Sequence, residues 1–205
     1  MNRDLVLRSL SMIAVYIGFT VISARHGDLM LASASILMKL LMLFSYFSDG
    51  FAYAGEALTG RFIGEGSADE VNSAIRGCFL WGGGCALLFL AVYGLAGVPL
   101  LRLFSGDASV VDAARQFLPW LMLMPVIGIP AFIWDGIYTG ATRTRDMMIS
   151  VMLCAIGFFV TYIGAYYFFK ADDVMAIHIL MATYFVHLAI RSLYLSIRSA
   201  RVKWI

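Results

Sequence analysis

Charged residues are scarce in this sequence. Asp, Glu, Lys and Arg make up 14% of the 205 residues, whereas hydrophobic residues make up 61%. A soluble globular domain usually carries about 25% charged residues. The composition therefore excludes a soluble globule, and a mean hydropathy of +0.86 agrees with that exclusion.

The sequence also lacks the patterns of several functional classes. The net charge is only +2, and no basic run is interleaved with exposed aromatic residues, so nothing supports nucleic-acid binding. The three cysteines lie inside apolar segments, which argues against a disulfide framework or a metal site. No nucleophile with a base, no paired carboxylates and no His-Glu-x-x-His helix is present. We therefore expect neither an enzyme nor a bound cofactor.

The hydrophobic residues are gathered into six segments. Each segment reaches the roughly 20 residues that an α-helix needs to cross a bilayer. The predicted fold is an all-α integral membrane protein, a single six-transmembrane-helix bundle that takes in residues 1–205. The expected helices cover about residues 5–24, 29–64, 69–97, 108–141, 146–169 and 174–198.

Three of these helices have features that affect their shape. The segment 29–64 would be about 54 Å long as a regular helix, so we expect it to tilt, bend or protrude from the bilayer. Pro99 is expected to end the third helix. The fourth segment carries three prolines, which predict kinks that neighbouring helices can accommodate in a membrane.

The loop cations predict the orientation of the bundle. The N-terminus, the second and fourth loops and the C-terminus share one side, which carries ten cations: Arg3, Arg8, Arg61, Arg76, Arg143, Arg145, Arg191, Arg198, Arg201 and Lys203. The other side carries four: Arg25, Arg102, Arg115 and Lys170. By the positive-inside rule, both termini are expected in the cytoplasm, with the chain spanning the inner (plasma) membrane.

One face of the segment 29–64 is polar. Its residues recur at spacings of three, four and seven: Ser35, Lys39, Tyr46, Asp49, Tyr53, Glu56 and Gly60. At 100° per residue they fall within about 100° of one another. Asp or Lys facing lipid costs about 2.5–3.5 kcal/mol on insertion scales, so this polar stripe is expected to line a water-filled cavity that carries substrate and ions. The alternative is a buried ion-pair network that only packs helices together.

A further acid, Asp135, lies in the fourth segment. Asp135 and the glycine after it, with Tyr138 close behind, resemble the stretch 49–53 and suggest a weak internal repeat. A carboxylate beside a glycine suits a cation or proton site, so Asp135 and Tyr138 join the candidate pathway. The alternative is a packing role for Asp135, with a salt bridge to Arg143.

His187 lies near the middle of the last segment. It shares an i, i+4 face with Thr183 and Arg191. A His titrates near physiological pH, so His187 is a candidate proton relay. The alternative is a hydrogen-bonded core histidine.

Two long motifs, residues 49–61 and 135–145, resemble the C-terminal half of the multidrug and toxic compound extrusion (MATE) transporters, most closely the DinF-like branch. The opening residues 2–4 and the proline-rich fourth segment share the resemblance. It implies secondary active export of small organic, often cationic, compounds in exchange for H⁺ or Na⁺. In such transporters two six-helix bundles enclose the cavity and rock in alternating access.

The chain also departs from the family pattern. The resemblance implies twelve helices, and the first six are not in this sequence. Asp135 matches an acid of the sodium-coupled branch, so it is a possible Na⁺ ligand, but the partner acid expected on the first helix here is missing between residues 5 and 24. Three interpretations of the chain follow. It is a fragment or truncated product, a structural membrane subunit, or one half of a transporter that assembles with a missing N-terminal half or with a second copy of itself.

Overall fold

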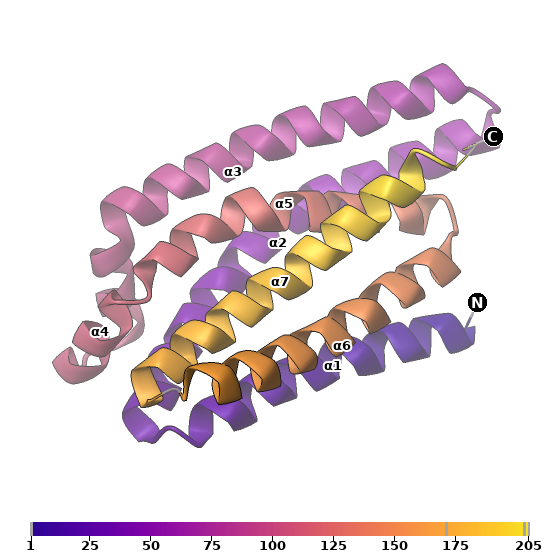
Figure 1. Cartoon of the computed structure of the whole chain (residues 1–205). Helices are drawn as coiled ribbons and strands as arrows, with labels where there is room; N and C mark the ends of the chain where they lie inside the picture. Colours follow the sequence, from indigo (N-terminus) through magenta and orange to yellow (C-terminus); the bar gives the residue numbers. More distant parts are fainter. Residues whose placement is uncertain (1, 171, 203, 205) are drawn as a thin grey trace.

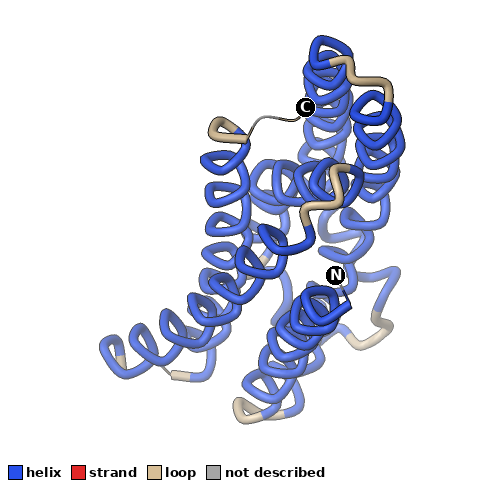
Figure 2. Tube along the Cα trace, turned by 90° about the vertical axis from the view of Figure 1, so that its right-hand side faces the viewer, coloured by secondary structure: helices blue, strands red, loops and turns tan. Residues whose placement is uncertain are grey.

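The computed structural model describes residues 2–170, 172–202 and 204. The described residues form helices and no strand (Figure 2). The helices are α1 (Asn2–Ala24), α2 (Asp28–Gly64), α3 (Ala68–Phe104), α4 (Ala108–Arg115), α5 (Leu118–Gly140), α6 (Thr144–Phe169) and α7 (Asp173–Ser199). All except the short α4 are long and apolar enough to cross a membrane. The predicted all-α, six-span fold is confirmed.

The helices pack as a bundle in which α5 is central. Helix α5 packs against α2, α3 and α7, while α6 lies between α7 and α1 (Figure 1). The start of α1 and the end of α7 lie at the same end of the bundle, as an even number of spans requires (Figure 1). Lys203, one of the cations used to predict the orientation, lies outside the described residues.

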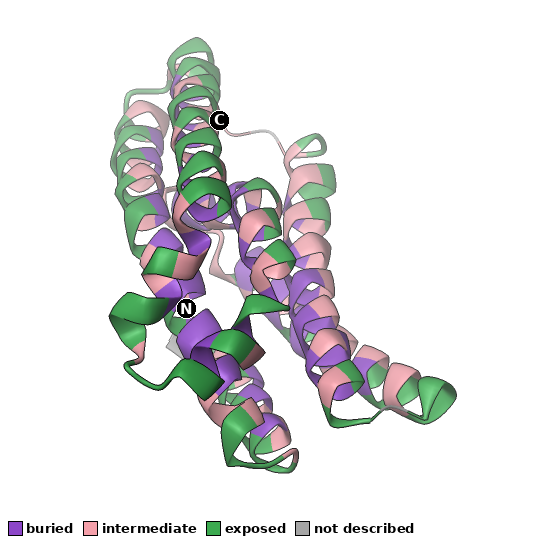
Figure 3. Ribbon diagram, turned by 90° about the vertical axis from the view of Figure 1, so that its left-hand side faces the viewer, coloured by how far each residue is buried: buried purple, intermediate pink, exposed green. Residues whose placement is uncertain are grey.

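The outer surface of the bundle is apolar. Exposed residues lie on the outward parts of the helices, and buried residues lie where helices face each other (Figure 3). The most exposed large hydrophobic side chains are Leu80, Trp81, Leu95, Leu103, Tyr167 and Phe168. A surface of this kind is stable against lipid and not against water. The chain is therefore a multi-pass membrane protein.

Two predicted boundaries differ from the structure. Helix α3 was expected to end near residue 97, but it continues through Pro99 to Phe104. A proline removes only one hydrogen-bond donor, and the fully buried Leu101 keeps the last turn packed against the bundle. Pro99 therefore lies inside the helix rather than ending it.

The expected single helix over residues 108–141 is two helices, α4 and α5. The chain breaks at Phe117, whose side chain is fully buried, and Pro119 lies in the first turn of α5. Proline favours the first turn of a helix, because that turn has no intrahelical partner for its N–H groups. Asp107 caps α4 by accepting a hydrogen bond from the Ser109 backbone at 2.8 Å, and its bonds with Ser109 lower the pKa of the Asp107 carboxyl.

The closest helix contact is between α2 and α5. A Cβ atom added at Gly136 would overlap the backbone of Ala52, and one added at Gly140 would overlap the backbone of Glu56. Glycines four residues apart let two helix backbones touch along one stripe. This contact fixes the position of α2 along the axis of α5, and so determines which polar residues of α2 face α5.

Substitution of Gly136 tests this contact. Gly136→Ala is expected to push α2 away from α5 and lower the free energy of unfolding by about 1–3 kcal/mol. Gly84→Ala on α3 is the matched control, because nothing lies within 4 Å of an added Cβ there. Unfolding in mixed micelles, followed by circular dichroism, should show a loss for the first variant only. Equal stability of the two variants would contradict the close contact.

Candidate functional site

A pocket of about 250 Å³ lies between α2 and α5, close to α1. We call it the α2–α5 pocket. It brings together four of the predicted pathway residues, Asp49, Tyr53, Glu56 and Asp135. Its other lining residues are Arg8, Ala52, Phe132, Gly136 and Thr139. The two long motifs of the sequence therefore meet at one site.

An ion cluster borders this pocket and joins three helices. The Asp135 carboxylate accepts a hydrogen bond from Arg8 Nη2 at 3.0 Å and another from Arg191 Nε at 3.0 Å. Arg191 Nη2 also contacts Asp135 Oδ2. Arg191 is 2% exposed and Asp135 is 9% exposed, so these charges are stabilised by one another rather than by water. We call this the Arg8–Asp135–Arg191 cluster.

Asp49 and Glu56 line the same pocket in a different electrostatic setting. Among the described residues, neither carboxylate forms an ion pair or a side-chain hydrogen bond. Asp49 instead interacts with the charge of Arg191, and Glu56 with that of Arg8, at longer range. Both side chains are half-buried. They are the acids of the pocket that can meet a ligand or a proton without breaking an ion pair.

The cluster is a poor fit for the possible Na⁺ ion at Asp135. Both oxygens of the carboxylate already face guanidinium groups, and those positive charges repel a cation. Within the described residues, no three Asp, Glu, His or Cys side chains gather as a metal site would require. The Na⁺ site at Asp135 stays a prediction that these contacts disfavour.

Arg143 was the alternative ion partner for Asp135, and the structure gives it a different acid. Arg143 Nη1 lies 3.8 Å from Asp146 Oδ2. Arg198 Nε also donates to Asp146, at 3.0 Å. The partners of Asp135 come instead from α1, which supplies Arg8, and from α7, which supplies Arg191.

Two stripe residues, Lys39 and Tyr46, lie away from the α2–α5 pocket. Both are exposed on the outer side of α2, and Tyr46 is 64% exposed. Tyr53 lines the pocket but is 68% exposed as well. The polar stripe therefore runs partly along the open surface of the bundle, and Asp49, Tyr53 and Glu56 are its residues that line the α2–α5 pocket.

Tyr138 and His187 lie in the core. The Tyr138 hydroxyl donates to the Leu195 carbonyl at 2.9 Å, and its ring packs against Trp134. Tyr138 comes three residues after Asp135, whereas Tyr53 comes four after Asp49, so Thr139 takes the matching position in the pocket. The apparent repeat thus does not place its tyrosines alike.

His187 lies one turn from Arg191 and is 5% exposed. Its ring stacks on Tyr184 with centroids 5.7 Å apart, and it lines a small cavity of about 20 Å³ together with Arg191. Among the described residues, neither ring nitrogen has a hydrogen-bond partner. His187 is therefore next to the ion cluster, and its relay role stays a prediction.

Arg8 and Arg191 are site residues that the sequence pattern did not identify, because both were counted among the loop cations. With these two removed, the cation count on the predicted cytoplasmic side falls from ten to eight, still against four. The position of Arg191 in its span could have identified it as a site residue. It lies eight residues before the end of α7, one turn after His187. An arginine at that depth needs an acidic partner.

Substitution of Arg191 tests the cluster. Arg191→Met is expected to leave Asp135 with Arg8 alone and to lower the free energy of unfolding by about 3–5 kcal/mol, the usual effect of breaking a buried ion pair. Arg61→Met is the control, because its bond to Glu65 is exposed at the end of α2. SDS titration should show a large change for Arg191 and little for Arg61. The reverse order would refute the structural role of the cluster.

The sequence of the chain is similar to those of known proteins. The MatE family model matches residues 5–163. DNA damage-inducible protein F of Escherichia coli (strain K12) is 36% identical over 161 residues, which are 78% of this chain and 35% of that protein. Protein DETOXIFICATION 45, chloroplastic, of Arabidopsis thaliana is 25% identical over 146 residues, 71% of this chain and 26% of that protein.

The chain thus spans about a quarter to a third of the length of these curated relatives. No solved structure matches the chain. MATE proteins are ion-coupled transporters that need no cofactor, and they are not enzymes. The family match covers more than half of the sequence, and the chain belongs to the MatE family, in its DinF-like branch.

Proposed function

We propose that this chain forms one half of a secondary active antiporter that exports small organic, often cationic, compounds in exchange for H⁺ or Na⁺. The observation that carries the proposal is the exposed polar stripe of α2. Lys39, Tyr46 and Tyr53 are exposed on a bundle whose outer surface is otherwise apolar. Exposed to lipid, such residues destabilise the inserted protein, so they favour a water-filled cavity closed by a further bundle.

The partner of this surface is a second six-helix bundle. It is either the remaining part of a longer protein or a second copy of this chain. The length of the curated relatives supports the first choice, because this chain covers at most 35% of them. Alternating access then consists of rocking the two bundles about the cavity.

The pocket chemistry supports an organic cation as substrate. Asp49 and Glu56 place two carboxylates on one wall, and Tyr53 adds an exposed aromatic ring. Cations bind over aromatic faces and beside carboxylates, while an apolar cavity wall accepts the rest of an organic molecule. The Arabidopsis relative is named for detoxification, which agrees with this proposal.

Coupling to an ion gradient is assigned to the acids without an ion pair. A coupling group must change its affinity for the ion between the two conformations. The affinity of Asp49 and Glu56 for the ion can change in this way when substrate or a partner helix replaces water at the pocket mouth. Asp135 stays paired with Arg8 and Arg191, so its part in this scheme is to position α1 and α7. Proton exchange fits this arrangement better than Na⁺ binding.

A structural membrane subunit that transports nothing is the alternative. It accounts for the tight contact of α2 with α5 and for the ion cluster. It does not account for exposed Lys39 and Tyr46, which add nothing to packing. The transport proposal explains both sets of residues.

Neutralising the pocket acids tests the proposal. In proteoliposomes that contain the chain with a supplied N-terminal half, gradient-driven export of ethidium should occur, and Asp49→Asn with Glu56→Gln should reduce its rate at least tenfold. The two amides keep the size of the side chains but cannot exchange a proton. Efflux is measured by ethidium fluorescence.

Glu65→Gln is the control for this experiment. Glu65 is an exposed acid that pairs with Arg61 at the end of α2, outside the pocket. The control should export at the full rate. Export by the Asp49→Asn, Glu56→Gln variant at the rate of the control would remove these acids from coupling, and no export by the unchanged protein would favour the structural subunit.

We also propose that both termini lie in the cytoplasm and that the membrane is the inner (plasma) membrane. The eight-to-four distribution of cations supports this orientation. In whole cells, a membrane-impermeant thiol reagent should label Asp172→Cys and not Arg201→Cys, in a background with the three native cysteines changed to alanine. Labelling of the two positions in the opposite pattern would invert the topology.

A further inference from the structure

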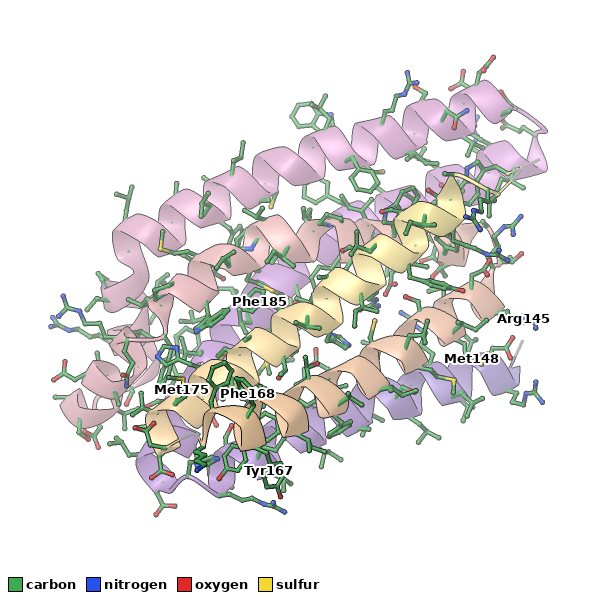
Figure 4. The ribbon with its side chains drawn as sticks, in the orientation of Figure 1. Arg145, Met148, Tyr167, Phe168, Met175 and Phe185 are labelled. Carbon is green, nitrogen blue, oxygen red and sulfur yellow. The ribbon has the colours of Figure 1, made fainter. Side chains whose placement is uncertain are left out.

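A groove of about 790 Å³ runs along the outer surface between the start of α1 and the first half of α6. It shares no residue with the α2–α5 pocket. Arg145 and Met148 mark its entrance on α6, at the end of the bundle where α1 begins (Figure 4). The proposed transport function does not use this groove.

The entrance of the groove is positively charged. Arg3 and Arg145 line it, and both are exposed. Within the described part of the chain, neither arginine forms an ion pair or a side-chain hydrogen bond. The acid at the entrance, Asp4, accepts a hydrogen bond from Thr144 Oγ1 at 3.4 Å. Two guanidinium groups beside one carboxylate leave a net positive charge.

The rest of the groove is an apolar stripe on α6. Its residues follow Arg145 at +3, +4, +7, +8 and +11: Met148, Ile149, Met152, Leu153 and Ile156. This spacing keeps them on one face of the helix. Eleven residues of helix extend about 16 Å, roughly half of the 30 Å hydrocarbon core of a bilayer. The stripe therefore has the length of one lipid leaflet.

We infer that this groove binds an anionic phospholipid of the phosphatidylglycerol class, with its phosphate between Arg3 and Arg145 and an acyl chain along the stripe. Arginine binds phosphate through paired N–H donors, and basic pockets between helices at a membrane interface bind anionic head groups. Asp4 can accept a hydrogen bond from a glycerol hydroxyl of the head group. The positive entrance disfavours an organic cation, which separates this site from the substrate pocket.

Native mass spectrometry of the full chain, purified in detergent with defined lipids, tests the inference. With equal phosphatidylglycerol and phosphatidylcholine of matched chains, the protein should retain phosphatidylglycerol at least tenfold more. Arg3→Gln with Arg145→Gln should remove that preference. Arg76→Gln, which changes an exposed arginine of α3 outside the groove, should keep it.

Two further arms make the outcome specific. Arg3→Lys with Arg145→Lys retains the charges and should retain most of the preference, which separates binding from misfolding. Glycerol phosphate, which has the head-group charge but no acyl chain, should not displace the lipid at concentrations up to a hundredfold higher. Unchanged phosphatidylglycerol preference in the double Gln variant would overturn the inference. A shift from dimer to monomer in that variant, without a change in lipid preference, would assign the groove to a second copy instead.

Discussion

The carboxylate of Asp135 is the point at which α1, α5 and α7 are joined, because it is the charge that balances Arg8 and Arg191 inside an apolar bundle. Arg191 is 2% exposed, so water cannot replace the acid. A charge in this setting is tolerated only with a partner. The position of α7 beside α5 is therefore set by a specific pair of side chains as well as by apolar packing, which in lipid discriminates weakly between helix faces.

The same turn of α5 also fixes α2. Gly136 follows Asp135 directly, and its missing side chain lets the backbone of α2 approach at Ala52. This approach brings Asp49 and Glu56 into one pocket with Arg8 and Asp135 of the ion cluster. Two adjacent residues of α5 therefore set the positions of three helices. The carboxylate of Asp135 holds α1 and α7, and the missing side chain of Gly136 lets α2 approach. Substitution of either residue is expected to affect stability and transport together.

The sequence predicted much of this arrangement, and its failures have local causes. Apolar length predicted the six spans, and periodicity grouped Asp49, Tyr53 and Glu56 on one face that does meet Asp135. Periodicity describes a single helix and says nothing of its neighbours, so the partners Arg8 and Arg191 were not identified. Tyr138 was misplaced because a motif match ignored one residue of spacing, which turns a side chain by about 100° on a helix.

The longer-range charges suggest how proton exchange at α2 would reach the other helices. Asp49 interacts with Arg191 of α7, and Glu56 interacts with Arg8 of α1. With all groups ionised, two arginines face three carboxylates, so the site carries one net negative charge. Protonation of Asp49 or Glu56 removes that excess and weakens the attraction of α2 for one specific neighbour. In the proposed antiport, a bound substrate cation would neutralise the same excess negative charge, so proton and substrate would compete for it, as exchange transport requires.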